Sequence, residues 1–313
     1  MRVQRTRSSP SALRSPLTRY PLGTNNLRSM GTPVHADVAY QGLPRTRVVS
    51  WNIRHGGGER LGPIFRALVG HAPDVIVLTE YRSSPSAPLL ERLAAAGWPH
   101  VVTSHPAPRR NGVAVLSREL LITRRPPRSI PPDRWVEVEV PAYALALAAV
   151  YAPVRGRDVS NKDAYWRGVL EAAAMRRHTA FLFVGDWNTG APIGDAEPEG
   201  RGFSCCEHFA AMREHGFVDA WRLLHPHQRT FSWSSRRGGA DLRGFRIDHA
   251  FISKALRDRL VSCEYSEVER CAAVSDHAAL LLDLRLGSFA SVEAAGSEKV
   301  PNLLLQPTGF AGG

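Results

Sequence analysis

Short apolar runs alternate with amphipathic segments along most of the chain. The runs "RVVSWNI" and "VIVLTE" are apolar at most positions, which is typical of strands buried on both faces. Between them, "RLGPIFRALVGH" places its apolar residues at helical spacing. The first part of the chain is therefore predicted to form a strand, a helix and a second strand.

The same alternation continues to residue 285. We expect further helices over 87–96, which Gly97 ends, and over 162–178 and 206–215. Further strands are expected near 100–103, 112–117, 135–140, 145–151, 180–186, 246–252, 261–267 and 278–285. Strands that are apolar on both faces and alternate with helices predict an α/β fold.

Composition agrees with a folded protein and adds one unusual feature. The 313 residues are 43% hydrophobic and 22% charged, as in ordinary globular proteins, and could form two average domains or one large one. The formal net charge of +11 and the isoelectric point near 10.1 are less ordinary. An excess of this size suggests a polyanionic partner, such as nucleic acid or an anionic membrane, although solubility explains part of it.

Both ends of the chain differ from the part between them. Residues 1–44 carry six arginines and one acid, are rich in Ser and Pro, and lack apolar periodicity, so we expect a basic disordered segment. The segment has no apolar core typical of a secretory signal; a transit peptide or a true start at Met30 are the alternatives. Residues 287–313 are expected to form a disordered tail. No run approaches the roughly 18 apolar residues of a membrane helix, so no membrane association is expected.

The four cysteines, Cys205, Cys206, Cys263 and Cys271, show no metal-ligand spacing along the sequence. A bridge between the adjacent Cys205 and Cys206 would be strained. We therefore expect reduced thiols in a cytoplasmic protein, without a metal-binding or nucleophilic role.

Polar residues stand at the ends of many predicted strands. They are Asn52, Glu80, Tyr151, Asp186, Asn188, Asp248, Asp276 and His277. Ligands of α/β sheets bind beyond strand ends, where a rigid sheet holds the side chains of the loops. Each residue alone has an ordinary explanation: Asn52 could cap a turn, Glu80 could pair with Arg82. Together they indicate a functional site.

Phosphodiester hydrolysis is the chemistry that this set suits. In-line attack by water places charge on the phosphoryl and leaving oxygens, so a site needs a hard cation, a base near the water and hydrogen-bond donors. Glu80, with Asn52 and Asp276 near it, would offer the oxygen ligands that Mg²⁺ prefers.

Two further pairs would handle protons and phosphate. Asp186 and Asn188, two apart on an extended strand end, would project to one side, so that one takes a proton while the other orients water or phosphate. His277 paired with Asp248 would be an oriented, largely protonated imidazole that donates to a phosphate oxygen.

The sequence resembles a known superfamily. The series "SWNIR", "VIVLTE", "GVAVLS", "VYAPV", "VGDWN", "RIDHAFIS" and "SDHAAL" is similar to the endonuclease/exonuclease/phosphatase superfamily in order and spacing. Within it, "GFVDAWRLLHP", "RTFSW" and "RGFRIDHAFIS" are most similar to the exonuclease III and apurinic/apyrimidinic endonuclease branch. The resemblance covers residues 45–286. It implies a single-domain, four-layered α/β sandwich of two packed mixed sheets with outer helices, and Mg²⁺-dependent phosphodiesterase activity in which Mn²⁺ could substitute.

The resemblance also implies a role for each polar residue. By motif position, Asn52 and Glu80 would lie beside the metal, and Asp276 would support the metal or its waters. Tyr151 would donate a hydrogen bond to phosphate, and Asp186 would activate the water. Asn188 would help to position water and phosphate, and Asp248 would orient His277.

The branch's apolar pocket for an abasic sugar maps onto Trp233, Phe245 and Ile247, which could equally be ordinary packing residues. Two features depart from the branch. The metal glutamate lies in "TEYR", where the branch usually has Gln-Glu-x-Lys, and the loop "IRHGGGERLG" is unusually rich in glycine. The N-terminal half is therefore less diagnostic of the substrate.

Three functions stay open on the sequence. The first is a monomeric nuclease of the DNA repair type, with DNA as the expected substrate. The second is a hydrolase of the same fold for a phospholipid head group or an inositol phosphate; the branches concerned tend to have His where this chain has Tyr151. The third is a noncatalytic nucleic-acid-binding module, which would not need a metal carboxylate.

Overall fold

The computed structural model describes residue 40 and residues 42–154, 159–197, 202–237 and 240–287. The expected N-terminal segment 1–44, with Met30, and the expected tail 287–313 lie almost wholly outside these residues, so both remain predictions. The described residues all belong to one compact unit within 35–313.

The first sheet has six strands in the order β14-β15-β1-β2-β4-β3. These strands are β1 (Arg45–Asn52), β2 (Val75–Tyr81), β3 (His100–Thr103), β4 (Gly112–Ser117), β14 (Leu260–Ser266) and β15 (Ala279–Arg285). β1 and β2 are parallel, and the other neighbours are antiparallel. The connection between the parallel strands contains α2 (Leu61–His71), as a crossover between parallel strands usually does.

The second sheet repeats this plan with six strands in the order β10-β13-β8-β7-β6-β5. These strands are β5 (Ile122–Arg124), β6 (Trp135–Val140), β7 (Leu145–Tyr151), β8 (Phe181–Asp186), β10 (Phe217–Asp219) and β13 (Asp248–Ser253). Its parallel pair is β7 and β8, connected through α4 (Val159–Arg176).

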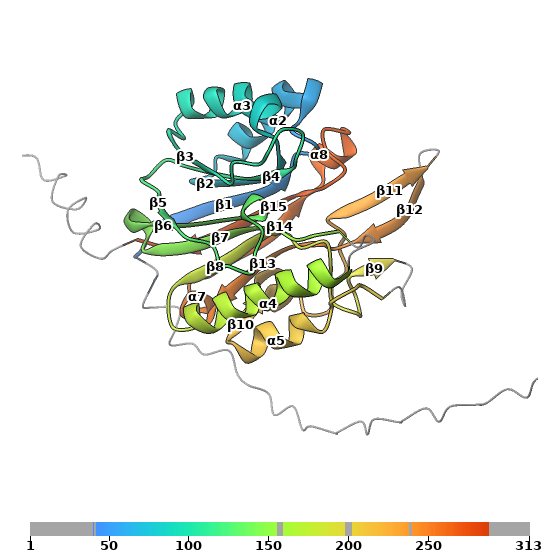
Figure 1. The fold of residues 1–313 in the computed structure, drawn as a ribbon. Helices are drawn as coiled ribbons and strands as arrows, with labels where there is room; N and C mark the ends of the chain where they lie inside the picture. The colour runs from blue at the N-terminus through green and yellow to red at the C-terminus, as the bar shows by residue number, and fades with distance from the viewer. Residues whose placement is uncertain (1–39, 41, 155–158, 198–201, 238–239, 288–313) are drawn as a thin grey trace, which may run out of the picture. The chain divides into compact units, whose positions relative to one another are not determined.

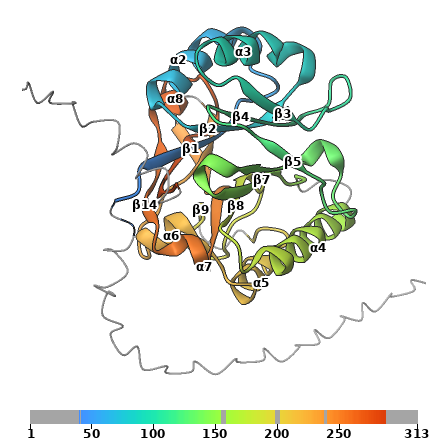
Figure 2. The ribbon, with the colours of Figure 1, turned by 90° about the vertical axis from the view of Figure 1, so that its left-hand side faces the viewer.

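The two sheets pack face to face, and helices cover their outer faces (Figures 1 and 2). The central layer of the core joins side chains of both sheets, among them Val77, Val138, Leu147 and Leu280. A second apolar cluster lies between the first sheet and α2 and α3 (Ser83–Ala95), and a third between the second sheet and α4 and α5 (His208–Glu214). Strands between two apolar layers need apolar side chains on both faces, which explains the continuous runs of the sequence. The expected four-layered α/β sandwich is confirmed.

The sequence pattern located the long elements and missed the short ones. The observed β3, β4, β6 and β7 have the predicted bounds, and the other predicted strands and helices are present with ends shifted by a few residues. A third sheet of β11 (Trp233–Arg237), β12 (Ala240–Phe245) and β9 (Ala196–Glu197) was not predicted. Also unpredicted are α6 (Ala220–Leu224), α7 (Lys254–Arg257), α8 (Val268–Cys271), β5, β10 and three 3₁₀ turns at 58–60, 132–134 and 141–143. Within the described residues, every helix is too short or too polar to cross a membrane.

Candidate active site

The predicted polar residues gather at one edge of the two sheets because of strand register. Tyr151 of β7 lies opposite Asp186 of β8, and Asp186 lies opposite Asp248 of β13. In the first sheet, Asn52 of β1 lies opposite Thr79, the residue before Glu80. A cavity of about 550 Å³ opens at this edge, and its walls include Glu80, Asp186, Asn188, Asp276 and His277.

Glu80 points to the cavity because its strand is irregular there. The pairing of β2 with β4 shifts between Thr79 and Tyr81, and Glu80 itself has a φ of 54°. A bulge of this kind re-aims a side chain that regular alternation would send elsewhere, at a cost in backbone strain. The carboxylate Oε2 accepts a hydrogen bond from the backbone N–H of His55 at 2.8 Å. Glu80 is thus held as an oriented, partly exposed carboxylate.

Asn52 connects the acidic residues of the two sheets. Its side-chain N–H₂ donates to Glu80 Oε1 at 3.3 Å and to Asp186 Oδ2 at 3.0 Å. Its oxygen accepts from the backbone N–H of Arg54 at 2.9 Å. The amide therefore orients both carboxylates, which is a positioning role beside the expected one near the metal.

The close approach of β8 to β7 places Asp186, the last residue of β8. Gly185 has a φ of 147°, and a Cβ there would lie 2.0 Å from the carbonyl oxygen of Val150, so no side chain fits. Asp186 is buried, and its Oδ1 accepts from the backbone N–H of Asn188 at 2.9 Å. Burial raises the pKa of Asp186, and the neighbouring Asp248 raises it further. Both causes disfavour the charged carboxylate.

Asn188 differs from its expected extended conformation. Its φ is 49°, and its side-chain N–H₂ donates to the carbonyl oxygen of Ala152 at 2.9 Å. Its own carbonyl oxygen accepts from Lys162 Nζ at 2.7 Å. Asn188 still lines the cavity beside Asp186, but a turned backbone rather than strand alternation puts it there.

His277 and Asp248 form the expected pair, with Nδ1 and Oδ2 2.8 Å apart and both side chains buried. Burial alone would lower the pKa of His277, but the charge of Asp248 and its hydrogen bond outweigh burial and raise the pKa to about 10. Ser275 donates to the carbonyl oxygen of Asn52 at 2.7 Å, which ties this turn to β1. The motif "SDH" thus holds a protonated imidazole at the cavity.

Tyr151 belongs to a hydrogen-bonded chain that the sequence only partly predicts. Its hydroxyl lies 3.5 Å from Glu80 Oε1 and accepts from Asn111 at 3.4 Å. Burial, then the charge of Glu80, raises the pKa of Tyr151 to about 12, so the phenol stays a neutral donor. His55 Nδ1 lies 2.8 Å from Glu80 Oε2. Sequence reasoning missed both His55 and Asn111; the glycine-rich loop was the only sign of His55.

Arg82 contacts Asn111 rather than Glu80. Its Nε donates to Asn111 Oδ1 at 2.6 Å. The ordinary explanation of Glu80 as the partner of Arg82 therefore does not apply, and Glu80 keeps its carboxylate toward the cavity.

Aromatic side chains form the opposite wall. Trp233 and Phe245 are stacked, with ring centroids 5.6 Å apart and an interplanar angle of 17°. They line the cavity together with Ile247 and with Phe203, which the sequence did not single out. The indole N–H of Trp233 donates to Asp276 Oδ2 at 3.3 Å. This wall therefore joins the acidic and apolar parts of the cavity.

Comparison with known proteins identifies the family. Residues 49–277 match the sequence model of the Endonuclease/Exonuclease/phosphatase family. The chain belongs to this family. A DNA-(apurinic or apyrimidinic site) endonuclease of Arabidopsis thaliana is 32% identical over 140 residues, which are 40% of this chain and 38% of that protein.

Two solved structures of the same fold cover 76% of the chain. A 3′ phosphatase, NExo, from Neisseria bound to a product DNA hairpin is 23% identical, with a TM-score of 0.68 over 99% of its length. An AP endonuclease from Archaeoglobus fulgidus is 22% identical, with a TM-score of 0.64 over 98% of its length. The expected superfamily and its fold are thereby confirmed.

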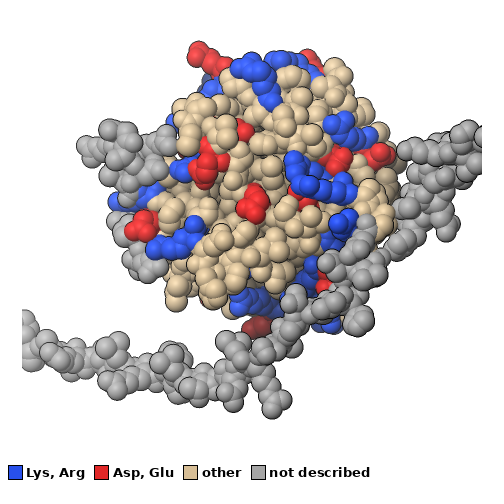
Figure 3. Space-filling view, turned by 180° about the vertical axis from the view of Figure 1, so that it is seen from behind, with Lys and Arg blue, Asp and Glu red and all other residues tan. Residues whose placement is uncertain are grey.

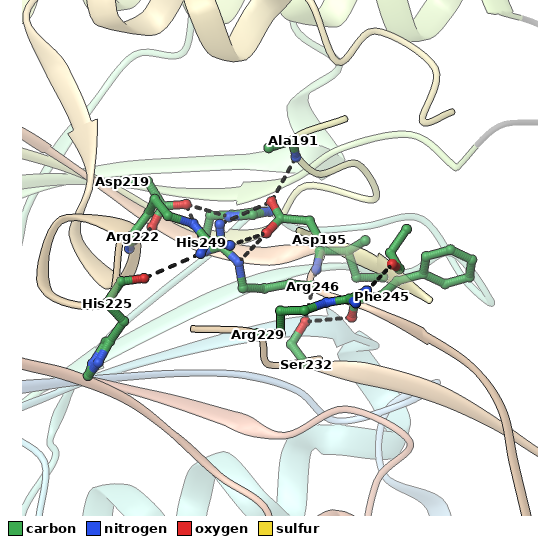
Figure 4. A network of polar contacts seen from close by, with 12 residues as sticks. Ala191, Asp195, Asp219, Arg222, His225, Arg229, Ser232, Phe245, Arg246 and His249 are labelled. Atoms are coloured by element: carbon green, nitrogen blue, oxygen red, sulfur yellow. Dashed lines mark hydrogen bonds and ion pairs between the residues drawn. The ribbon is translucent and has the colours of Figure 1, made fainter. Parts of the chain in front are cut away.

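A buried ionic network surrounds Arg246, which directly precedes the cavity residue Ile247 (Figure 4). Arg246 is 1% exposed and donates to Asp195 at 2.8 and 3.0 Å and to Asp219 at 2.7 Å. Ser232 accepts from the backbone N–H groups of both Ile247 and Asp248 at 3.0 Å. The network fixes the backbone that carries the cavity wall and the partner of His277. Sequence reasoning missed it, because Asp195 and Asp219 lie 51 and 27 positions from Arg246 along the chain.

The acidic part of the cavity can hold a divalent cation. Asp186, Asp248 and His277 each place a potential ligand atom within 4.8 Å of the others. His277, however, is paired with Asp248 and keeps its proton, which disfavours cation binding by that pair. The carboxylate of Glu80, oriented by Asn52 and by the N–H of His55, is the better-placed oxygen donor.

Proposed function

We propose that the protein is a Mg²⁺-dependent phosphodiesterase that hydrolyses the nucleic-acid backbone, with DNA as its main substrate, in the manner of exonuclease III and AP endonucleases. One observation carries the proposal: a metal-type carboxylate, a buried base, a protonated imidazole and a neutral phenol line or adjoin one cavity with an aromatic wall. A binding module would need none of the first three.

The first group of residues would bind the metal. Glu80, with Asn52 and Asp276, would hold Mg²⁺ or, as a substitute, Mn²⁺. The cation supplies charge stabilisation for the phosphoryl and leaving oxygens. The oxygen donors fit this group, since Mg²⁺ is bound by one or two carboxylates and keeps several waters.

The protein's own groups would act on the water and the phosphate. Asp186 accepts the proton of the attacking water, and Asn188 helps to position that water. Protonated His277 and the hydroxyl of Tyr151 donate hydrogen bonds to the phosphate oxygens. Asp248 keeps His277 protonated and aligned, at 2.8 Å.

The aromatic wall would select the substrate. Trp233, Phe245 and Ile247 surround an apolar space that suits a sugar without a base, whereas a normal nucleotide would have to unstack at a cost of a few kcal/mol. The relative from Arabidopsis is an apurinic or apyrimidinic endonuclease by name, which supports this choice.

Basic side chains offer contacts for the flanking strand. Exposed Arg54 lines a second cavity of about 320 Å³, which shares Trp233 and Asp276 with the first. On the face in Figure 3, basic residues are interspersed with acidic ones rather than gathered into one patch. We therefore expect a few specific phosphate contacts near the cavity. We also propose that the protein acts in the cytoplasm, where its four free thiols would stay reduced, and that it acts as a monomer.

The test is a substrate panel with purified protein and Mg²⁺: intact, nicked and abasic duplexes, a phospholipid and inositol phosphates. We expect cleavage of nucleic acid, fastest at abasic sites, and none with Asp186→Asn. Turnover of the phospholipid or inositol phosphates alone would replace the proposal by the second function. Binding of DNA without any hydrolysis would favour the third.

A further inference from the structure

A second group of metal-ligating side chains lies where α4 meets the start of α5. Asp163 belongs to α4, Cys205 and Glu207 precede α5, and His208 is its first residue. Each offers one ligand atom, and these four atoms all lie within 4.8 Å of one another. We propose that these side chains form a binding site for Zn²⁺, separate from the active-site cavity.

The thiol of Cys205 is the strongest indication of a ligand. The residue is only 8% exposed, and among the described residues its sulfur has no hydrogen-bond partner. Its backbone has a φ of 63°, which a residue with a side chain rarely adopts and which costs free energy. The structure thus holds a buried sulfur among three other ligand atoms, in a conformation that must be stabilised elsewhere.

His208 and Asp163 already face each other across this group. His208 Nε2 lies 3.2 Å from Asp163 Oδ1, while the other oxygen of Asp163 lies 3.4 Å from Arg167. The imidazole stacks on Trp166, with ring centroids 5.4 Å apart and an interplanar angle of 24°. The stacking on Trp166 therefore fixes the plane of the imidazole before any cation binds.

The donor types select the metal. One sulfur, one imidazole nitrogen and carboxylate oxygens are the ligands of Zn²⁺, whereas Mg²⁺ takes oxygen ligands and keeps its waters. Binding would form a Zn–S bond, and the thiol proton would pass to the solvent. Asp163 and Glu207 bring two negative charges to the group, and the thiolate formed on binding would add a third, beside the positive charges of Lys162 and Arg167.

The site would fasten two segments that support the catalytic turn. Lys162, next to Asp163, donates to the carbonyl oxygen of Asn188 at 2.7 Å. Ser204, next to Cys205, accepts from the hydroxyl of Thr189 at 2.9 Å. α4 and α5 lie side by side on the outer face of the second sheet (Figure 1). We therefore assign Zn²⁺ a structural role, in which it raises thermal stability.

This proposal revises the expectation that the cysteines bind no metal. Along the sequence Cys205 has only His208 at a ligand-like spacing, and Asp163 lies some forty residues earlier. The fold, not the spacing, brings the three together.

The test uses Co²⁺ as a spectroscopic probe on the full chain. Tetrahedral Co²⁺ bound to a thiolate gives a near-ultraviolet charge-transfer band, which oxygen ligands of the active-site cavity cannot give. The wild type should show this band, and Zn²⁺ but not Mg²⁺ should abolish it. Cys205→Ser should remove the band and weaken Zn²⁺ binding more than the roughly 100-fold that loss of an outer-sphere partner costs.

The adjacent cysteine is the matched control. Cys206→Ser should keep the band, because Cys206 is outside the four-residue group. His208→Gln, with an intact thiol, should weaken Zn²⁺ binding and lose the rise in Tm that Zn²⁺ gives the wild type. No band in the wild type, or a band that survives Cys205→Ser, would overturn the proposal.

Discussion

Removing the buried carboxylate of Asp283 should destabilise the fold without affecting the site. Asp283 of β15 lies opposite Arg47 of β1, is 1% exposed, and accepts hydrogen bonds from Arg45, Arg47 and Ser262. Burial alone would raise the pKa of Asp283, but these bonds outweigh burial and lower it to about 2 from an ordinary 3.8. β1 and β15 also adjoin Asn52 and His277, at the opposite end of the pair.

The pKa difference sets the magnitude and the sign of the effect. Each pKa unit corresponds to about 1.4 kcal/mol, and solvent screens the partly exposed Arg45 and Arg47, so the ionised carboxylate contributes at most roughly 2 kcal/mol to the free energy of unfolding at neutral pH. Because the folded pKa is depressed, this contribution is complete above the unfolded pKa near 3.8. It is lost as the pH falls toward about 2 and should reach about half its value near pH 3.

Urea unfolding of Asp283→Asn and wild type at several pH values measures this difference. The two free energies of unfolding should differ by at most roughly 2 kcal/mol at pH 7 and converge below pH 4. Glu139→Gln is the matched control: Glu139 of β6 accepts two hydrogen bonds from one arginine, Arg124 of the edge strand β5, but that pair is exposed to solvent and should contribute much less to stability. Equal losses for the two variants, or a difference that persists unchanged to pH 3, would refute the reasoning.

Further predictions concern the site. Glu80→Gln should lower kcat by several orders of magnitude with an unchanged circular dichroism spectrum, and excess EDTA should abolish wild-type activity. With Asp186→Asn, the logarithm of DNA affinity should fall linearly with the logarithm of salt concentration, by roughly 0.9 per phosphate contacted; a flat response would favour a small substrate. Trp233→Ala should lower kcat/KM at abasic sites at least about tenfold more than at ordinary 3′ ends, while Trp233→Phe, which keeps a stacked ring, should preserve the ratio. Gly185→Ala should prevent folding, because its Cβ would lie 2.0 Å from a backbone oxygen. A thermal melt of this variant should show no cooperative unfolding transition.

The long strands were predictable because their physical cause is local. β4 and β7 are apolar at most positions on both faces, and β6 alternates valine with Trp135, Glu137 and Glu139; runs of either kind have few alternatives to a strand. The hairpin of β11 and β12 lacks that pattern: "WSSRR" is polar or basic at four of its five positions, and Asp241, Arg243 and Gly244 interrupt "ADLRGF". The stacked rings of Trp233 and Phe245 stabilise the hairpin instead, and stacking between strands leaves no local pattern.

The active-site residues were predictable as a set but not in their geometry. Glu80, Asp186 and Asn188 stand at the ends of predicted strands. They were therefore expected to lie close together, because parallel neighbours end at the same edge of a sheet. Glu80 and Asn188, however, both have positive φ, and Gly185 between β8 residues has a conformation that only glycine tolerates. Local rules fail at these three positions because the surrounding sheets impose the conformation, and such failures are expected at functional sites.

Two polar pairs were not predicted for a related reason. Arg246 and Asp195 are 51 positions apart, and Asp163 and His208 are 45 apart, so neither pair has a signature along the chain. The buried Arg246 must have its partner supplied by the fold, because desolvation of a charge without one costs several kcal/mol, whereas Asp163 is partly exposed. Both groups adjoin the segments that carry catalytic residues: one fixes Ile247 and Asp248, the other the turn after β8. The contacts that could not be predicted from the sequence therefore position the motifs that could be.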